Sequence, residues 1–151
     1  LEHLTKRNKE AVRFFGLVGL MPAGASDEDF TKIWGTGWQE LAGILVRSSL
    51  LLKTERKLQG MLSWYSLYPF MTRYAEERLD ETDLNLFCKK LAKHLVEKGT
   101  FYYGKLGTAA VDSENHFQSF IMEELNFKAC IYREVMSCKK STNDQRLQNN
   151  Y

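Results

Sequence analysis

The chain has 151 residues, of which 44% are hydrophobic and 26% are charged, and its formal net charge is +2. This length suits one domain, or two small ones that share a core, and the apolar fraction excludes a wholly disordered chain. Because 21 basic residues nearly balance 19 acidic ones, no overall field draws the chain onto nucleic acid or an anionic membrane. No apolar run approaches the roughly 18 residues that a membrane span needs. The chain opens without an initiator Met or a signal-peptide pattern, so we expect a piece of a larger protein.

Three helices are predicted in the first third of the chain. Apolar residues at helical spacing predict the first over 8–21, and it ends before Pro22 because a proline disfavours helical backbone in the residue ahead of it. Ser26 is placed to cap a short second helix by accepting from the N–H of Asp29. The third helix is predicted over 38–48. The core positions expected on these helices are Ala11, Phe14, Phe15, Val18, Met21, Phe30, Ile33, Trp34, Trp38, Leu41, Ala42, Leu45 and Val46.

A two-stranded hairpin and a further helix follow. Residues 50–54 and 61–67 are predicted to be strands, the second of them rich in Trp and Tyr, with a turn over 56–60 between them. Pro69 suits the first turn of the next helix, where its missing N–H costs nothing. The inward positions of that helix are expected to be Phe70, Tyr74 and Leu79. Three helices, a hairpin and a helix in this order predict a winged-helix domain over residues 1–80.

The second half of the chain predicts only helices. An amphipathic stripe is formed by Leu84, Phe87, Cys88, Leu91 and Leu95. Gly99 is expected to end this helix, a looser connection follows over 99–112, and a long second helix is predicted over 114–137. The two helices form an antiparallel pair over 81–138, and 139–151 is expected to be a disordered tail. The predicted fold class is therefore mainly α with a small β-hairpin: a winged-helix domain followed by an antiparallel helical pair.

Neither the cysteines nor the histidines form a redox or metal-binding pattern. Cys88, Cys130 and Cys138 are odd in number and lack CxxC spacing. We therefore expect the cysteines to behave as small apolar residues. We also expect the protein to lie in a reduced, cytoplasmic compartment. The histidines are His3, His94 and His116. None of them has a Cys or another His at ligand spacing, so no zinc site is predicted.

One stretch approaches a nucleotide-binding motif. Residues 99–106 match the P-loop pattern GxxxxGK[ST], except that Leu106 stands where a hydroxyl must bind magnesium. The stretch also follows a predicted helix, whereas a P-loop follows a buried strand. Acidic neighbours such as Asp27 and Glu28 do not face each other on a helix, and no serine has the GxSxG context of a nucleophile. No catalytic residue is predicted, and the chain is not expected to be an enzyme.

A winged helix also suggests DNA binding, which its third helix would carry. A recognition helix offers Arg, Lys, Asn or Gln to base edges. Here Gln39 and Arg47 could do so, and Glu40 would repel phosphate. The hairpin adds a modest positive charge at Lys53, Arg56 and Lys57, which is equally typical of a solvated turn. A DNA-binding domain of a transcription regulator stays open as the alternative function.

The order and spacing of several short motifs resemble a known family. The first motif reads FGLVGLMPAGASDEDF over 15–30, and the last reads YSLYPFMTRYA over 65–75. Together with 33–38 and 45–51, they resemble the winged-helix domain of signal-transduction STAND ATPases, the NB-ARC and NACHT class, in the branch that carries tetratricopeptide repeats. The run EELNFKA over 123–129 resembles the Glu-x-x-Asn-Leu-x-Ala element that opens the repeat array in these proteins.

The resemblance implies candidate contact residues. In this family the winged helix packs on the nucleotide-binding domain, and the His of a Met-His-Asp motif contacts bound ADP. Leu67, Tyr68 and Pro69 occupy those three positions and depart from the motif at each. A Tyr hydroxyl can donate to phosphate but carries no positive charge. Tyr68 and Pro69 are thus candidates for nucleotide sensing or interdomain contact, with plain packing of Tyr68 at the domain junction as the open alternative. The same resemblance implies an interdomain or repeat-start role for Glu123 and Asn126.

The implied function is that of a non-catalytic regulatory and protein-interaction module in a STAND-type, nucleotide-switched signalling ATPase, coupling nucleotide state to assembly. ATP or ADP would bind to the upstream domain, and this chain is expected to hold neither a cofactor nor a metal. Its partners would be that upstream nucleotide-binding domain, the downstream repeats of the same chain and other proteins. Contact with nucleic acid or membrane is not expected. The alternative is the DNA-binding winged-helix domain of a transcription regulator.

Overall fold

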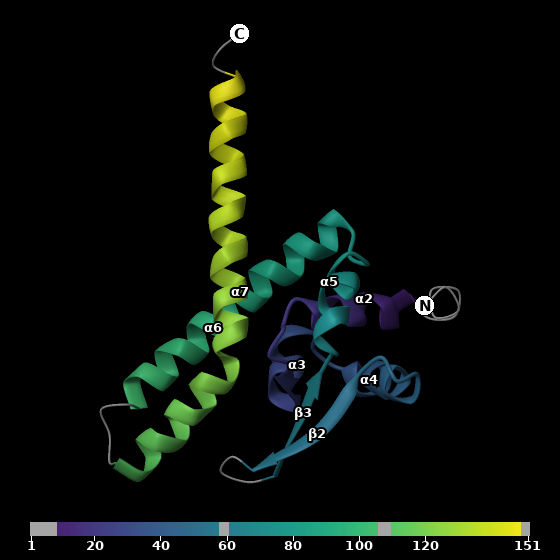
Figure 1. Cartoon of the computed structure of the whole chain (residues 1–151), viewed down its shortest axis with the longest axis vertical. Coiled ribbons are helices and arrows are strands. Elements are labelled where there is room, and N and C mark those ends of the chain that lie inside the picture. The colour runs from purple at the N-terminus through teal and green to yellow at the C-terminus, as the bar shows by residue number, and fades with distance from the viewer. Residues whose placement is uncertain (1–8, 58–60, 106–109, 149–151) are drawn as a thin grey trace.

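The computed structural model describes residues 9–57, 61–105 and 110–148, and it is mainly helical with one small antiparallel sheet (Figure 1). This confirms the predicted fold class of a mainly α chain with a small hairpin. The elements follow the order helix, strand, helix, helix, strand, strand, and then four further helical segments. Within these residues, no helix combines the length and the apolarity that crossing a bilayer requires.

Three helices surround the first part of the core. They are α2 (Lys9–Gly19), α3 (Asp27–Ile33) and α4 (Trp38–Arg47), and α2 and α4 lie within a few residues of their predicted bounds. The predicted cap of α3 is confirmed. The Asp29 N–H donates to Ser26 Oγ over 3.3 Å, and the Ser26 N–H donates to Asp29 Oδ2 over 2.8 Å. This reciprocal pair closes the start of α3 and holds the Asp29 carboxylate in place.

The sheet has three strands in the order β1-β3-β2. They are β1 (Ala25–Ser26), β2 (Leu52–Lys57) and β3 (Met61–Ser66). The hairpin of β2 and β3 follows the prediction, whereas β1 is not predicted, because two residues are too few to show an alternating pattern. Strand β2 extends past the predicted start of the turn, and residues 58–60 of that turn lie outside the described residues.

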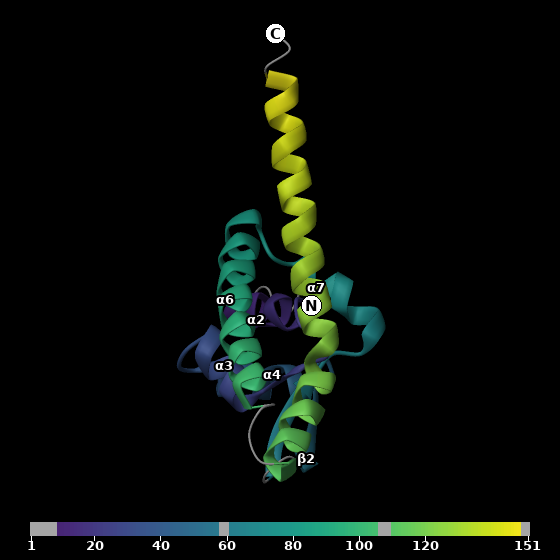
Figure 2. The same cartoon turned by 90° about the vertical axis from the view of Figure 1, so that its left-hand side faces the viewer.

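Four helical segments complete the chain. A short 3₁₀ helix, η1 (Pro69–Met71), leads into α5 (Thr72–Glu76). The long helices α6 (Glu81–Lys105) and α7 (Ala110–Gln148) follow. Helix α7 crosses α6 and projects well beyond the rest of the molecule (Figure 2).

The two long helices extend further than predicted. Gly99 lies within α6 and is not a C-cap: a Cβ at this position would lie 3.4 Å from the Phe127 ring of α7. The predicted loose connection over 99–112 is helical at both ends, over 99–105 and 110–112. Residues 106–109 lie outside the described part. Helix α7 also runs through 139–148, where the sequence predicts a disordered tail. Gly99 instead packs against Phe127 of α7, a contact that no local sequence pattern reveals.

One hydrophobic core joins the first part of the chain to the helical pair. Phe87 of α6 stacks on Trp34, with ring centroids 5.6 Å apart. Leu91 and Leu95 are buried in the same cluster as Phe14, which confirms the amphipathic stripe predicted for this helix. Other buried members of the cluster are Phe15, Leu17, Val18, Phe30, Trp38, Leu45 and Tyr65.

The segment after the hairpin follows the prediction only in part. Phe70 is 80% exposed, which contradicts its predicted inward position. Tyr74 is 41% exposed, with its ring edge-on to Phe15 of α2, and Leu79 packs against the core as predicted. Ala75 is buried. Ala75 packs against Gly19 of α2, where an added Cβ would lie 2.7 Å from the Glu76 backbone nitrogen. Helices α2 and α5 therefore meet almost backbone to backbone at Gly19 and Ala75.

Candidate functional site

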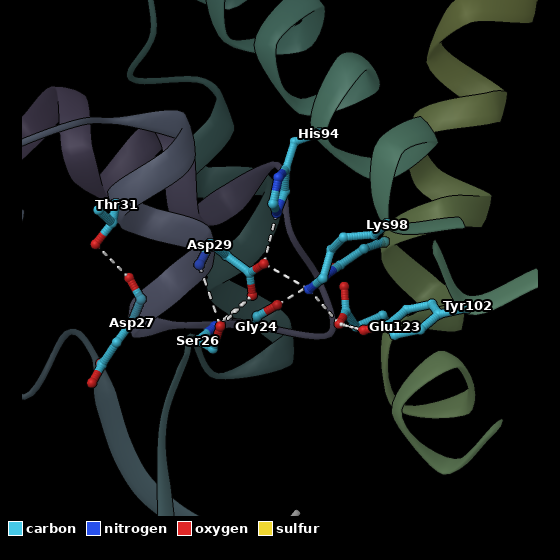
Figure 3. A network of polar contacts seen from close by, with 10 residues as sticks. Gly24, Ser26, Asp27, Asp29, Thr31, His94, Lys98, Tyr102 and Glu123 are labelled. Carbon is cyan, nitrogen blue, oxygen red and sulfur yellow. Dashed lines mark hydrogen bonds and ion pairs between the residues drawn. The ribbon is translucent and has the colours of Figure 1, made fainter. Parts of the chain in front are cut away.

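Buried and partly buried polar side chains gather where α3, α6 and α7 meet (Figure 3). We call this group the junction network, and its members are Asp29, His94, Lys98, Tyr102 and Glu123. The two carboxylic acids are 3% and 4% exposed, respectively. Carboxylates are rarely buried this deeply unless they are paired, so the contacts of each member define what the site can do.

Asp29 receives contacts from Ser26, the residue that caps its helix, and from α6. Its Oδ2 accepts from the N–H and the hydroxyl of Ser26, each over 2.8 Å. Its Oδ1 accepts from Lys98 Nζ over 2.6 Å and lies 2.7 Å from His94 Nε2. Burial by itself would raise the pKa of Asp29, but the hydrogen bond with His94 and the charge of Lys98 outweigh it and hold this pKa below its ordinary range. Asp29 is therefore an ionised anchor for α6.

Lys98 bridges α3 and α7. Its ammonium donates to Asp29 Oδ1 and, over 2.5 Å, to Glu123 Oε1. Tyr102 donates its hydroxyl proton to the same Glu123 oxygen over 3.1 Å. Burial would lower the pKa of Lys98, but the two carboxylates raise it above its ordinary range, so the ammonium stays charged. Burial raises the pKa of Glu123 despite the adjacent ammonium. Lys98 thus bridges Asp29, whose pKa is lowered, and Glu123, whose pKa is raised.

Asn126 fastens α7 to the segment that precedes β1. Its Oδ1 accepts from the Ala23 N–H over 2.9 Å, and its Nδ2 donates to the Gly24 carbonyl over 2.8 Å. Gly24 has a φ of +80°, and a Cβ there would collide with strand β3, so the position requires glycine. Arg133 adds a further tie from α7 by donating to the Leu20 carbonyl over 3.0 Å. The inner face of α7 is therefore bonded to backbone on the N-terminal side of β1.

The contacts of the junction network are internal to the protein. Lys98 is held charged between two carboxylates, which leaves no lone pair for nucleophilic attack. Among the described residues, no group of three or more His, Cys, Asp and Glu is arranged to hold a metal ion. The segment 99–105, which approaches the P-loop pattern, is helical. What this arrangement can do is hold three helices in one relative position.

A pocket of about 470 Å³ opens beside the junction network. Its wall includes His94, Lys98 and Glu123, together with the rings of Trp64 and Phe101. Of the charges in this wall, those of Lys98 and Glu123 are already paired with each other.

The structure separates the two pairs of residues that the resemblance singles out. Glu123 belongs to the junction network, and Asn126 forms the neighbouring tie to the backbone. Tyr68 and Pro69 stand instead at the surface, at the start of η1. Tyr68 is 38% exposed, and its ring stacks on the exposed ring of Phe70 with centroids 5.7 Å apart. Tyr68 therefore forms an aromatic surface patch rather than part of the buried site.

Sequence reasoning misses Asp29, His94 and Lys98 as members of one site. It recognises Asp29 only as a cap partner and assigns no role to the other two. A usable signal exists, because His94, Lys98 and Tyr102 recur every four residues and so share one face of α6. Their partners lie far away in the sequence: 65 residues separate His94 from Asp29, and 25 separate Lys98 from Glu123.

Comparison with known proteins adds no relative to this geometry. No family model, no curated protein and no solved structure matches the chain. Function is therefore inferred from the contacts and surfaces of the chain itself.

Proposed function

We propose that the chain is a non-catalytic regulatory and protein-interaction module of a STAND-type, nucleotide-switched signalling ATPase. In this proposal, residues 1–80 form a winged-helix domain and 81–138 begin an array of tetratricopeptide-like repeats. An upstream domain of the parent protein binds ATP or ADP, and the chain itself contributes no cofactor. Movement of the winged helix then shifts the parent protein between closed and assembly-competent states. A cytoplasmic location belongs to the same proposal, because Cys88 and Cys130 are free thiols.

The observation that carries this proposal is the apolar surface of α6 and α7. The exposed large apolar side chains on the described parts of these helices are Leu86, Val96, Phe101, Tyr103, Phe117, Phe120, Ile121, Leu125, Ile131, Tyr132, Val135 and Met136. A groove of about 590 Å³ between the helices is lined by Val96, Tyr103, Phe127 and Ile131. Large exposed apolar surfaces mark interaction sites. In a repeat array, the next helical pair covers such a face.

The junction network supports the coupling part of the proposal. A module that transmits a movement needs a stiff connection between the part that moves and the part that binds. Lys98 joins Asp29 of α3 to Glu123 of α7, and Asn126 bonds to backbone ahead of β1. These ties favour movement of the helical pair and the first part of the chain as one body. Glu123 and Asn126 are also the residues for which the resemblance implies an interdomain or repeat-start role.

Tyr68 and Pro69 supply a second contact surface in this proposal. The stacked rings of Tyr68 and Phe70 are exposed at the start of η1, where an upstream domain could cover them. Aromatic residues that are exposed in a free module and rigidly held are common centres of protein interfaces. This patch is the position at which the nucleotide-binding domain would sense or hold the winged helix.

The alternative, DNA binding through α4, has weaker support. The exposed residues of α4 include Gln39, Glu40 and Arg47, so acid and base are balanced along the helix. Asp27 and Glu28 lie beside the same helix surface. Binding to the phosphate backbone needs a positive stripe, whereas carboxylates interrupt the cations here.

The apolar surface is tested with two variants of the parent protein. The double variant Ile131→Ser, Tyr132→Ser removes exposed apolar area from α7, and Lys89→Ser removes an exposed side chain from the polar side of α6. Light scattering in ADP and in ATP measures assembly. We expect the double variant to weaken nucleotide-dependent assembly, while Lys89→Ser leaves it unchanged and neither alters the melting temperature of the isolated chain. Full assembly of the double variant would count against the proposed surface.

A DNA titration separates the two functions. The isolated chain is added to labelled duplex DNA of mixed sequence, and fluorescence anisotropy is followed from about 50 mM to about 200 mM salt. We expect no tight binding at either concentration. Strong binding that falls steeply with salt would favour the DNA-binding alternative over the interaction module.

A further inference from the structure

Helix α7 carries a row of apolar side chains on the side that faces away from the core. We call this row the outer stripe, and it consists of Phe117, Ile121, Leu125, Tyr132 and Met136. These side chains are between 45% and 65% exposed. With about 3.6 residues per turn, all five lie within about a third of a turn of one another, and the buried Glu123 and Asn126 lie on the opposite side of the helix. The outer stripe therefore faces solvent in the part of the chain that the structure describes.

The outer stripe is separate from the groove between α6 and α7. The groove of about 590 Å³ is lined on its α7 side by Phe127, Cys130, Ile131, Glu134 and Val135. It includes no residue of the outer stripe. In the proposed function, the next helical pair covers the groove. The outer stripe runs along another side of α7 and is open to a partner of its own.

The outer stripe is symmetric about the point between residues 126 and 127. The positions that lie equally far from this point are Phe117 with Met136, Ile121 with Tyr132, and Leu125 with Lys128. An antiparallel helix of the same sequence would therefore place an apolar side chain opposite almost every apolar side chain of the stripe. A partner of different sequence would not require this symmetry. The spacing thus favours a second copy of this chain as the partner.

The charges on the stripe select the antiparallel orientation. Lys128 is paired with Glu124 one turn away over 2.6 Å, and both side chains are largely exposed. In the antiparallel arrangement, Lys128 of one copy lies beside Leu125 and Glu124 of the other, so its stem covers an apolar residue and its ammonium meets a second carboxylate. A parallel arrangement would place Lys128 against Lys128 and Glu124 against Glu124. Such like-charge contacts disfavour it.

The area of the stripe suits a specific contact. A large apolar or aromatic side chain that is half exposed contributes on the order of 100 Å². The outer stripe therefore offers roughly 500 Å² per copy, and two copies bury about 1,000 Å² before Lys128 and the flanking side chains are counted. Specific protein interfaces begin at about 1,000 Å² in total, and standard ones bury about 1,200–2,000 Å². An interface of this size is typical of a reversible dimer.

We propose that the outer stripe of α7 pairs antiparallel with the outer stripe of a second copy of this chain. A two-fold axis level with residues 126 and 127 relates the two copies. The pairing rests on the proposed function for its role, because it gives assembly of the parent protein a contact between identical chains. Its formation by the isolated chain requires no nucleotide.

Sedimentation equilibrium of the isolated chain measures the pairing. The chain has a mass of 17.6 kDa, and a reducing agent keeps its free thiols from cross-linking. Over a range of about 1 µM to about 200 µM, we expect the mean mass to rise reversibly towards twice that of one chain.

Two variants test whether the outer stripe is the contact. The double variant Ile121→Ser, Leu125→Ser removes apolar area from both halves of the dimer, and we expect at least about tenfold weaker association. Val96→Ser is the matched control, because Val96 is an exposed apolar residue of α6 outside the stripe. It should leave association unchanged. Melting is compared at about 1 µM, so that dissociation does not contribute to the melting temperature.

Charge reversal tests the orientation without removing apolar area. In the antiparallel pair, Glu124→Lys places a new cation beside Lys128 of the other copy at two symmetric sites. We expect at least about threefold weaker association. Adding Lys128→Glu to the same chain should restore it. In a parallel pair, Glu124→Lys exchanges one like-charge contact for another and leaves association unchanged.

Three results would overturn the pairing. One is a mass of 17.6 kDa at every concentration. Another is a loss of association with Val96→Ser as large as that with the double variant, which would indicate unspecific apolar contact. The third is unchanged association of Glu124→Lys, which decides the question even if the double variant melts at a lower temperature. Nucleotide-dependent assembly of the parent protein is measured separately, so a failure here is distinguishable from a failure of the proposed function.

Discussion

Lys98 of α6 and Glu123 of α7 form an ion pair with a nitrogen–oxygen distance of 2.5 Å, and the same ammonium also holds Asp29 of α3. The side chains of the two acids are 5% and 4% exposed, whereas that of Lys98 is 21% exposed. One cation therefore compensates two buried carboxylates from different helices. This makes Lys98 the residue on which the junction network depends most.

We expect Lys98→Met to be the most destabilising single substitution in the network. It preserves most of the side-chain volume but leaves two buried carboxylates without their shared cation, and breaking a buried pair in this way costs about 3–5 kcal/mol. Urea unfolding followed by circular dichroism measures the change in the free energy of unfolding. Lys93→Met, an exposed position on the same helix, is the control and should change it little. A small effect of Lys98→Met would mean that the network is hydrated rather than closed.

Asp29 and Glu123 should change the free energy of unfolding in opposite directions as the pH falls. The pKa of Asp29 is lowered on folding, so its contribution is present above about pH 4 and is lost as the pH falls towards the folded value. The pKa of Glu123 is raised, so its ionisation costs stability, and this cost disappears as the pH falls. Asp29→Asn should therefore flatten the loss of stability in acid, and Glu123→Gln should steepen it. Urea unfolding between about pH 2 and about pH 7 checks both signs.

Asn126→Ala should destabilise the chain through the backbone groups that it leaves behind. The Ala23 N–H and the Gly24 carbonyl both lose their partner, and a buried polar group without one costs about 1–3 kcal/mol. Denaturant unfolding should show a loss of at least about 2 kcal/mol. Gln118→Ala, exposed on the same helix, should be nearly neutral. Equal effects of the two substitutions would show that α7 is not fastened at this point.

Two glycines should respond to alanine in opposite directions. At Gly19 the new Cβ would lie 2.7 Å from backbone atoms of α5, so Gly19→Ala should cost about 1–3 kcal/mol through overpacking. At Gly104, in α6, the described residues place no atom within 4 Å of the new Cβ apart from the neighbouring backbone of the helix itself, so Gly104→Ala should stabilise by about 0.5–1 kcal/mol. Thermal unfolding of both variants measures the contrast.

Tyr68→Phe separates a packing role from a contact role. Because the Tyr68 ring is 38% exposed and stacks on Phe70, loss of the hydroxyl should leave the melting temperature of the isolated chain unchanged. If the upstream domain accepts a hydrogen bond from this hydroxyl, the parent protein loses about 0.5–1.5 kcal/mol of closed-state stability. ADP exchange should then be about two- to twelve-fold faster. A large melting change in the chain without any change in ADP exchange would make Tyr68 a packing residue.

The candidate site could be predicted only in part. Glu123 and Asn126 follow from the resemblance, and the cap of Asp29 follows from a local pattern, but nothing local assigns a role to His94 or Lys98. The partner of Lys98 is set by which face of α6 meets α3 and α7, and this depends on the packing of Phe87, Leu91 and Leu95 as a whole.

By itself, the sequence determined the kind and order of the elements. Helical periodicity, the Ser26 cap and the hairpin pattern act over a few residues, and the backbone responds to them directly. Only the tertiary structure decided where α6 and α7 end and which polar groups meet. Asn126 and Gly24 are 102 residues apart and yet share a hydrogen bond. Such pairs form because burial of one common core brings distant segments together, and a buried polar group must then accept whichever partner the packing leaves within reach.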